Sequence, residues 1–420
     1  MTGATRRVLG LSLLAVAAGI GSACGSSASD GGPASGGASG AAGFGAAGAG
    51  TGGSSGASAG TGGQDAGGGN AGDASTADAP ADAAPDLKGW TQQASFLQIV
   101  TAGGWNSKQL LVDPHAAGRL ALEFQKHANQ AWYLIWENGT FSKKFEEDAS
   151  VTSDGAGFDA LGHFYLYYRT SADAFVAHWP NLNKSWDTIK LDVPAGYYPS
   201  WPPTQLSVAM GSVPRFGLYS SNRLFDATGK LDSAGYLSWD VLPPAQWQPS
   251  SLDGNGFSSL AFVPGKPSEF YVTTSSAHSL ARCTSSSTAV TCQELHGFAS
   301  APSALWLTPA NPDLLCLRVK NAAGDWELRL STDGGKTTNA IPHPFGTQFV
   351  SVALSPKDDK TIVVWKDGNT DLQVSHDQGA SWNPAALPEA GNTSLSGAGI
   401  DNAGTLFLVR GDALFSRSTY

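Results

Sequence analysis

The sequence predicts an all-β protein: a seven-bladed β-propeller with four-stranded blades, preceded by a disordered tether rich in Gly, Ala and Ser. Three observations predict this fold. Residues 86–420 repeat a strand, turn, strand pattern seven times, with a period of about 48 residues. The predicted strands are rich in Val, Leu, Phe, Tyr and Trp, whereas apolar patterns of period 3.6 are absent. Four short strands within about 45–50 residues are typical of one propeller blade.

Each repeat is recognised by an apolar strand that ends in a short turn, often with Pro or Asp, and leads into a second apolar strand. The first strands with their turns lie at 111–114, 158–160, 206–210, 261–264, 305–309, 352–356 and 398–401. The second strands lie at 120–124, 164–168, 216–219, 270–272, 314–317, 361–365 and 405–409. Two further short strands complete each unit, as at 371–374 and 382–387.

The position of Trp90 indicates how the ring closes. Trp90 lies 24 residues before Pro114, and Trp186 lies 24 residues before Met210, at the start of an outer strand. Trp90 therefore opens an outer strand before the first repeat, whereas the last repeat ends at Tyr420 without one. We expect residues 89–98 to supply the fourth strand of the last blade, because closure removes two open sheet edges.

The first 23 residues have the pattern of a secretory signal peptide. Arg6 and Arg7 precede a run of apolar and small residues from Val8 to Ile20, and small residues follow before Cys24. Ser22, Ala23 and Cys24 resemble a bacterial lipobox, although Gly21 stands where Leu is usual. The resemblance implies a lipid on Cys24 and a protein anchored in the cell envelope, at the outer membrane or the cell surface. The alternative is an ordinary secreted protein.

Residues 24–85 are predicted to be a disordered linker. Of the 52 glycines, 20 lie between Gly25 and Pro85, a stretch with no Lys or Arg, and all 13 tryptophans lie at Trp90 or later. Such a composition buries too little apolar surface to fold. A Gly-rich coil of this length spans roughly 40–50 Å. We therefore expect three segments: a signal peptide at 1–23, a lipidated Cys and linker at 24–85, and the propeller at 86–420.

Two segments of the domain carry a short acidic turn motif. The motif S-x-D-x-G-x-x-W is complete at Ser375, Asp377, Gly379 and Trp382. A second copy at Ser331, Asp333 and Gly335 has Thr338 in place of the aromatic residue. The Asp can bond backbone N–H groups of its turn, and the Gly can take a positive φ. On these residues the chain resembles the sialidase-like BNR/Asp-box propeller superfamily, in which the motif is structural and occurs in hydrolases and non-enzymes alike.

The cysteines are consistent with export. Cys283 and Cys292 flank a predicted hairpin in the fourth repeat, and the ends of paired strands lie within disulfide reach. We expect these two residues to be bonded. Cys316 lies inside an apolar strand and is expected to be a buried thiol. No spacing matches a zinc site such as C-x-x-C, and we expect neither a metal nor another cofactor.

Propellers bind ligands at one mouth of their channel, which is formed by the loops from each outer strand to the next inner strand and by the loops between the middle strands. The repeat register places aromatic residues on these loops, with the densest cluster at 197–201. Aromatic faces beside amides and carboxylates suit sugar rings, whereas the alternative role is packing between blades. The predicted ligand-binding residues are Trp105, Tyr197, Tyr198, Trp201, Arg223, Trp247 and Asp253, with Phe298 and Phe345 as further aromatic candidates.

The sequence does not identify a catalytic residue. The resemblance would imply an Arg triad and a Phe/Tyr-Arg-Ile-Pro motif for a sialidase, and no such motif is present. Another glycosidase would need two carboxylates about 5–9.5 Å apart across the mouth. A polysaccharide lyase would combine His, Tyr and Arg, which no spacing marks here. The carboxylates available on loops are Glu146, Glu147, Asp148, Asp154, Asp253 and Asp325, each of which could equally be a solvated loop charge.

Charge and composition narrow the function further. The formal net charge of −10 argues against a nucleic-acid binder, which needs a basic face. We therefore expect a monomeric, surface-tethered module that binds a glycan or a cell-envelope protein and meets the membrane only through its lipid. The alternatives are an exported carbohydrate-active enzyme that uses the same mouth and a protein-binding assembly or structural factor.

Overall fold

The computed structural model of the protein describes strands of the C-terminal domain. The chain divides into two compact units, Met1–Ala77 and Asp78–Tyr420. The described residues all lie in the second unit: 89–96, 106–126, 130–137, 139–146, 152–169, 174–179, 187–191, 205–208, 215–220, 223–231, 237–241, 246–248, 257–286, 289–366, 371–388 and 395–419. The predicted signal peptide, Cys24 and the linker lie outside them.

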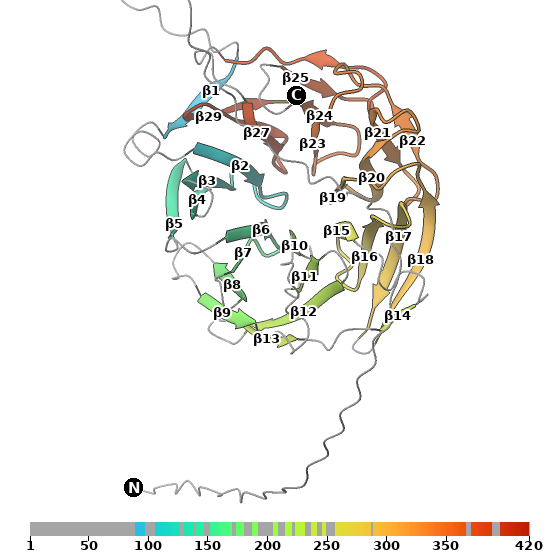
Figure 1. Ribbon diagram of the computed structural model, residues 1–420. Helices are drawn as coiled ribbons and strands as arrows, with labels where there is room; N and C mark the ends of the chain where they lie inside the picture. Colours follow the sequence, from blue (N-terminus) through green and yellow to red (C-terminus); the bar gives the residue numbers. More distant parts are fainter. Residues whose placement is uncertain are drawn as a thin grey trace, which may run out of the picture. The chain divides into compact units, whose positions relative to one another are not determined.

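The described strands form sheets that succeed one another around a common centre, and all their pairings but one are antiparallel (Figure 1). The first three sheets follow chain order from the inner strand outward. They are β2 (Asn106–Val112), β3 (Leu120–Lys126), β4 (Gln130–Glu137) and β5 (Thr140–Glu146); β6 (Thr152–Phe158), β7 (Phe164–Arg169), β8 (Ala174–Trp179) and β9 (Asp187–Leu191); and β10 (Gln205–Val208), β11 (Arg215–Ser220), β12 (Arg223–Leu231) and β13 (Leu237–Val241).

The remaining sheets continue the ring. They are β15 (Phe257–Phe262), β16 (Glu269–Thr274), β17 (Ser279–Ser285) and β18 (Ala289–Gly297) with β14 (Gln246–Gln248) added at the edge; β19 (Ala304–Thr308), β20 (Asn311–Lys320), β21 (Trp326–Ser331) and β22 (Asn339–Ile341); β23 (Ser351–Leu354), β24 (Ile362–Trp365), β25 (Leu372–Ser375) and β26 (Asn383–Pro384); and β27 (Leu395–Ile400), β28 (Thr405–Arg410) and β29 (Ala413–Ser418) with β1 (Thr91–Ser95).

The all-β propeller fold is thus observed, but the prediction of seven four-stranded blades is wrong. Among the described strands, six sheets have four strands, and the sheet around β15–β18 has five. The extra strand, β14, pairs in parallel with β18 through Gln246–Ala289, Trp247–Val290 and Gln248–Thr291. The sequence does not predict this strand, because it is three residues long and lies in a connection with prolines on both sides. β14 covers an outer sheet edge that would otherwise be open.

The ring closes through the N-terminal strand, as the position of Trp90 predicted. β1 pairs antiparallel with β29, and Thr91 lies opposite Ser416. Trp90 itself is 3% exposed and donates from Nε1 to the Ala386 carbonyl at 2.8 Å. It packs in one core with apolar side chains from β24, β25, β27 and β28. The first and last parts of the domain are therefore held together by both a backbone ladder and a buried side chain.

The hydrophobic cores lie between neighbouring sheets. Apolar side chains from β19–β22 pack against those from β23 and β24, and the cluster around Phe96 joins the last sheet to the first. Around the centre, β6, β10, β15, β19, β23, β27 and β2 are the inner strands, and most of them contact the next inner strand in this order. This arrangement leaves two faces. We call the face with the connections from second to third strands and from sheet to sheet the mouth face, and the opposite face the turn face.

Buried aspartates organise the turn face. Asp113, Asp159 and Asp401 follow the inner strands β2, β6 and β27 and are at most 1% exposed. Each accepts backbone N–H groups of its own turn, as Asp401 Oδ1 does from Thr405 at 2.8 Å. Asp401 Oδ2 also accepts the Gly118 N–H at 2.8 Å, which joins the last sheet to the first. These carboxylates explain why Asp recurs at this point of the repeat.

Arg119 links the first two sheets on the same face. Its guanidinium contacts Asp113 Oδ2 at 3.2 Å and Glu137 Oε1 at 2.8 Å, and it donates to the Gly162 carbonyl at 2.9 Å. Gly162 has a φ of +76°, and a Cβ there would lie 1.7 Å from Arg119 Nη1, so only glycine allows this approach. Burial raises the pKa of Asp113 to about 6, against the lowering effect of its bond to the His115 N–H and of Arg119.

The cysteines in the described part of the chain occupy two environments. Cys283 and Cys292 lie opposite each other on β17 and β18 and form a disulfide with an S–S distance of 2.05 Å. Cys316 on β20 is a buried free thiol, and burial raises its pKa to about 12. Among the described residues, no group of three His, Cys, Asp or Glu side chains could hold a metal ion.

Candidate functional site

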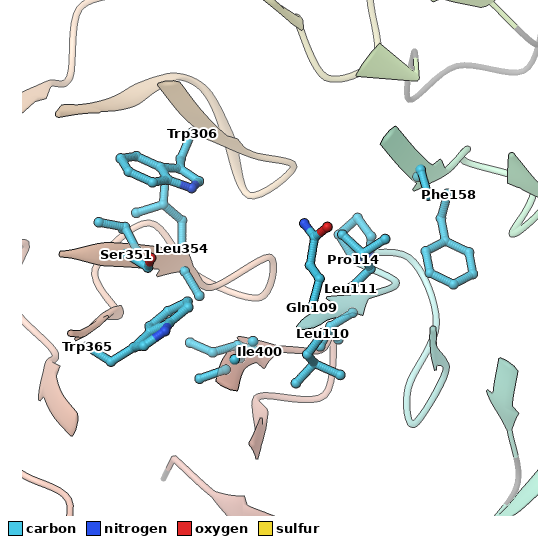
Figure 2. Close-up of a pocket in the computed structure, with 18 of the residues that line it drawn as sticks. Gln109, Leu110, Leu111, Pro114, Phe158, Trp306, Ser351, Leu354, Trp365 and Ile400 are labelled. Atoms are coloured by element: carbon cyan, nitrogen blue, oxygen red, sulfur yellow. The ribbon is translucent and has the colours of Figure 1, made fainter. Parts of the chain in front are cut away.

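The inner strands surround a central cavity of about 600 Å³ (Figure 2). Its lining comes from β2, β6, β10, β19, β23 and β27, together with Pro114 in the turn after β2 and Trp365 at the end of β24. The volume lies within the range of about 300–1,000 Å³ that is usual for sites of small ligands. The lining residues include Gln109, Trp306, Ser351, Trp365, Ser396, Gly397 and Gly399.

The cavity wall combines aliphatic side chains with two indoles and a few neutral polar groups. Figure 2 shows the Gln109 amide pointing into the space, with Trp306 and Trp365 across from it. The other polar lining side chains are the hydroxyls of Ser351 and Ser396, and no carboxylate, imidazole or cationic side chain occurs among the described lining residues. Such a wall can stack against a ring and exchange hydrogen bonds with neutral groups.

Glycines on β27 set the width of the cavity at the point where the ring closes. A Cβ at Gly399 would lie 2.5 Å from Val112 Cγ2, and one at Gly397 would lie 3.1 Å from the Leu110 backbone nitrogen. These contacts are tighter than ordinary carbon contacts of about 3.5–4.0 Å. β2 and β27 therefore approach each other as closely as they do because neither glycine carries a side chain.

A buried arginine on the mouth face lies next to Trp306, which lines the cavity. Arg318, near the end of β20, is 8% exposed. Its Nη1 donates to the Val350 carbonyl at 2.7 Å, and its Nε donates to Ser303 Oγ at 2.9 Å. Val350 directly precedes β23, so Arg318 joins the second strand of one sheet to the entry of the next.

Aromatic rings surround this guanidinium. Its carbon lies 3.4 Å from the ring centre of Phe349, 5.6 Å from that of Trp306 and 5.8 Å from that of Trp326. Phe349 and Trp326 meet edge to face, with their centres 5.2 Å apart and their planes at 86°. Lys320 adds a second cation, with Nζ 4.8 Å from the Trp326 ring centre. We call Trp306, Arg318, Lys320, Trp326 and Phe349 the Arg318 cluster.

The Arg318 cluster is open to solvent at Lys320 and at the ring of Phe349. Phe349 is 41% exposed, one of two large apolar side chains in the described part of the chain that are noted as exposed. Its ring lies close to the guanidinium, and Trp326 bounds it edge-on. Trp306 also lines the central cavity, so the cluster and the cavity share a wall. The result is a fixed aromatic platform that shares Trp306 with the cavity wall and is bounded by two cations.

The loop that carries Phe349 is braced at several points. The indole Nε1 of Trp382 donates to the Pro342 carbonyl at 2.7 Å. The backbone N–H of Trp326 donates to the Thr347 carbonyl at 3.3 Å. His343, in the same loop, is 9% exposed, and neither ring nitrogen has a hydrogen-bond partner among the described residues. Burial lowers the pKa of His343 below its usual value. We expect this imidazole to be neutral in the folded protein near pH 7.

Most of the predicted ligand-binding residues fall outside the described part of the chain. Trp105, Tyr197, Tyr198, Trp201 and Asp253 lie there. Two others are described by their backbone alone. Arg223 is the first residue of β12, and Trp247 is the central residue of β14, at the outer edge of its sheet rather than on a loop at the cavity.

The other aromatic candidates pack between sheets. Phe298 packs against the core beside β17 and β20, and its ring lies 4.7 Å from that of His296. Phe345 packs against the core that joins β20 and β24. Of the loop carboxylates, Asp325 lies in the turn after β20, where its N–H donates to Asn321 Oδ1 at 3.0 Å. None of these three residues lines the central cavity.

Sequence reasoning missed the residues of the Arg318 cluster. Trp306 lies in a predicted apolar strand, and the repeat pattern marks neither Trp326 nor Phe349. One signal was available: Arg318 interrupts the apolar run from Leu314 to Val319, and a cation inside a buried strand needs partners. The aromatic residues of the cluster supply part of that environment.

The two acidic turns share one hydrogen-bond pattern. Ser331 Oγ donates to Asp333 Oδ1 at 2.8 Å, and Ser375 Oγ donates to Asp377 Oδ1 at 2.7 Å. In both turns the N–H of the Gly four residues after the Ser donates back to the Ser Oγ, at 2.8 Å for Gly335 and 2.7 Å for Gly379, and both glycines have a φ of +87°.

The aspartates of these turns are strongly held in their charged form. Hydrogen bonds lower the pKa of Asp333 to about 2, chiefly those from Thr337, and that of Asp377 to about 2, chiefly those from Ser381. Both turns join third and fourth strands, so they lie on the turn face, away from the Arg318 cluster. Their role is local: they lock outer hairpins.

Comparisons with known proteins support the fold. No family model matches the chain, and no curated protein matches it. Among solved structures, YCF48 from Cyanidioschyzon merolae is similar with a TM-score of 0.52 at 13% identity, over 79% of this chain and 99% of that one. The Cps50 (Swd1) β-propeller domain from Myceliophteria thermophila is similar with a TM-score of 0.50 at 11% identity, over 75% and 97% of the two chains. At these identities the likeness shows the β-propeller fold and nothing of the function.

Proposed function

We propose that this chain is an exported, surface-tethered β-propeller that binds a glycan at its mouth face without transforming it. The observation that carries the proposal is the exposed Phe349 ring, held between Arg318 and Trp326 in a cluster that shares a wall with the central cavity. A platform of this kind is fixed before the ligand arrives, so binding loses little side-chain freedom.

Sugar rings suit this platform. The axial C–H groups of a pyranose carry partial positive charge, and the face of an aromatic ring carries partial negative charge. The hydroxyl groups at the edge of the sugar need hydrogen-bond partners, and the adjoining cavity offers the Gln109 amide and the Ser351 and Ser396 hydroxyls. The wall shared through Trp306 would let a chain of several sugars continue from the platform into the cavity.

The proposed tether comes from the sequence. The leader, Cys24 and the low-complexity segment support a lipid-anchored domain held clear of a membrane surface. The hydrogen bonds of the two acidic turns support membership of the BNR/Asp-box superfamily. None of the described residues belongs to a helix long and apolar enough to cross a membrane. Mass spectrometry of the N-terminal peptide from the producing cells would reveal or refute a diacylglyceryl group on Cys24.

A glycan array tests the binding function. We expect the purified chain to bind a subset of the glycans, and Phe349→Ala or Trp326→Ala to weaken that binding at least about tenfold, as truncation of a central aromatic contact does. Leu161→Ala is the matched control, because Leu161 is 50% exposed and lies on the turn face. This variant should bind as the unaltered chain does.

Three results would each contradict a part of the proposal. Release of shorter products from a bound glycan would show an enzyme and direct attention to the loop carboxylates. Absence of binding to every glycan, by a chain whose circular dichroism shows intact strands, would favour a protein partner in the cell envelope. Equal losses in Phe349→Ala and Leu161→Ala would show that binding, although real, does not use the Arg318 cluster.

A further inference from the structure

We infer that the mouth-face platform selects acidic sugars, with Lys320 binding the carboxylate of a uronic acid whose ring lies on Phe349. This inference rests on the proposed glycan-binding function and names its ligand class. The placement of Lys320 supports it, although the chain as a whole is acidic, with a formal net charge of −10.

Lys320 is fixed at its backbone and open at its tip. Its N–H donates to Ser300 Oγ at 3.1 Å, and the Ser300 hydroxyl donates to its carbonyl at 2.9 Å. The residue is exposed, and Nζ lies over the Trp326 ring. This is the one lysine in the described part of the chain that is seen over an aromatic ring. The ring holds the ammonium group near the platform without neutralising its charge.

Lys320 has a second cation beside it. Arg318 lies over the same Trp326 ring, with its guanidinium carbon 5.8 Å from the ring centre. The nearest acidic side chain on the adjoining strand, Glu327, is bound to Arg329 at 2.8 Å. Asp325 lies in the turn between Lys320 and Trp326, and its carboxylate opposes the effect.

The geometry matches one sugar unit. Nζ of Lys320 and the ring of Phe349 both contact Trp326, at 4.8 Å and 5.2 Å from its centre. Trp326 thus links the two groups, and the inference is that the ammonium group reaches the edge of a pyranose ring stacked on the open part of Phe349. In a uronic acid the carboxylate lies at that edge, as a substituent of the sugar ring. An ionised acceptor makes a stronger hydrogen bond to an ammonium group than a hydroxyl does.

Matched pairs of glycans test this inference. The probes are oligosaccharides of galacturonic acid, of guluronic acid and of hyaluronan, each beside its methyl-esterified form, in which the carboxylate is neutral and the ring is unchanged. Isothermal titration calorimetry on the full chain should show at least one acid bound about three- to tenfold more tightly than its ester, the range expected for one partly exposed charged contact. Raising the salt concentration should narrow the difference.

Variants assign the preference to Lys320. Lys320→Met keeps most of the apolar stem and removes the charge, so the acid should bind only as tightly as its ester. Lys336→Met is the matched control, because Lys336 is exposed on an acidic turn of the opposite face. Phe349→Ala should weaken acid and ester alike, since both stack on the same ring.

The possible failures are distinguishable. If the chain binds glycans but binds none of the three acids better than its ester, the acidic preference is refuted and the glycan-binding function stands. If Lys320→Met and Lys336→Met lower the preference equally, general charge rather than Lys320 is responsible, and the inference falls. If the folded chain binds no glycan at all, the proposed function falls, and this inference falls with it.

Discussion

Replacing Trp90 with Ala should open the ring at its closure. Trp90 is 3% exposed, and its indole fills the core between the sheet around β23–β25 and the last sheet. Its Nε1 donates to the Ala386 carbonyl at 2.8 Å. The residue directly precedes β1, which supplies the outer strand of the last sheet by pairing with β29. Loss of the side chain therefore weakens the anchor of a strand whose partners lie more than 300 residues away.

The expected loss of stability is large. Truncation of a buried Trp to Ala costs about 3–5 kcal/mol in the free energy of unfolding. The lost hydrogen bond leaves the Ala386 carbonyl without this partner and adds about 1 kcal/mol. The sum is a sizeable part of the total of about 5–15 kcal/mol that is usual for a folded protein. Trp90→Phe retains most of the apolar contact and should cost about 1–2 kcal/mol, because the hydrogen bond and part of the ring are lost.

Urea unfolding followed by circular dichroism measures these differences. The control is Phe349→Ala, which removes an aromatic ring that is 41% exposed and should change the free energy of unfolding by no more than about 1 kcal/mol. A loss of less than about 1 kcal/mol in Trp90→Ala would refute the reasoning. It would mean that β1 contributes little to the integrity of the ring and that the other inter-sheet contacts suffice.

Two further predictions concern stability. The double variant Cys283→Ala/Cys292→Ala should lower the free energy of unfolding by about 2–3 kcal/mol, because the disulfide restricts the unfolded chain. The loss is at the low end of the usual range, since the sequence separation of the two residues is only 9. An unchanged urea midpoint would contradict this prediction. Burial lowers the pKa of His343 in the folded protein. Below about pH 6.5, the unfolded chain therefore takes up a proton at this site more readily than the folded chain, and the free energy of unfolding decreases as the pH is lowered. His343→Leu should therefore lose less stability between pH 7.5 and pH 5.5 than the unaltered chain, and equal losses in the two proteins would show that His343 is not responsible.

The sequence predicted the inner part of each sheet well because that part obeys local rules. An inner strand is buried and apolar, and the turn that follows needs a residue whose side chain can bond backbone N–H groups. Asp159 and Asp401 do so in the structure, at the positions that the repeat had marked. Ring closure was also visible, since Trp90 stood one strand ahead of the first repeat.

β14 could not be predicted by the same rules. It has three residues, pairs in parallel and lies at an outer edge, so neither alternation nor a turn signal announces it. Phe298 and Phe345 show a second limit. Their places on connecting loops were read correctly, but whether a loop aromatic faces the ligand or the neighbouring sheet depends on how two sheets meet.

The Arg318 cluster could not be predicted from the sequence by either of these rules. Its aromatic residues come from an inner strand, a third strand and a connecting loop, at positions 306, 326 and 349, and only the contact between two sheets brings them to one guanidinium. No spacing within one repeat encodes that meeting. The available signal was a cation inside a buried strand, which shows that aromatic or polar partners exist but not which residues they are.

The same cluster connects the fold to the proposed function. Arg318 donates to the carbonyl that immediately precedes β23, so it is part of the joint between two sheets, and it also supports the ring of Phe349. The platform therefore takes its position from the packing of the sheets and not from a loop that is free to move. A ligand that stacks on Phe349 would meet a surface already held in place by the contact that joins these two sheets. This is the physical reason for placing the binding site at the Arg318 cluster. The sequence alone had favoured a different place, the aromatic residues of the long connections.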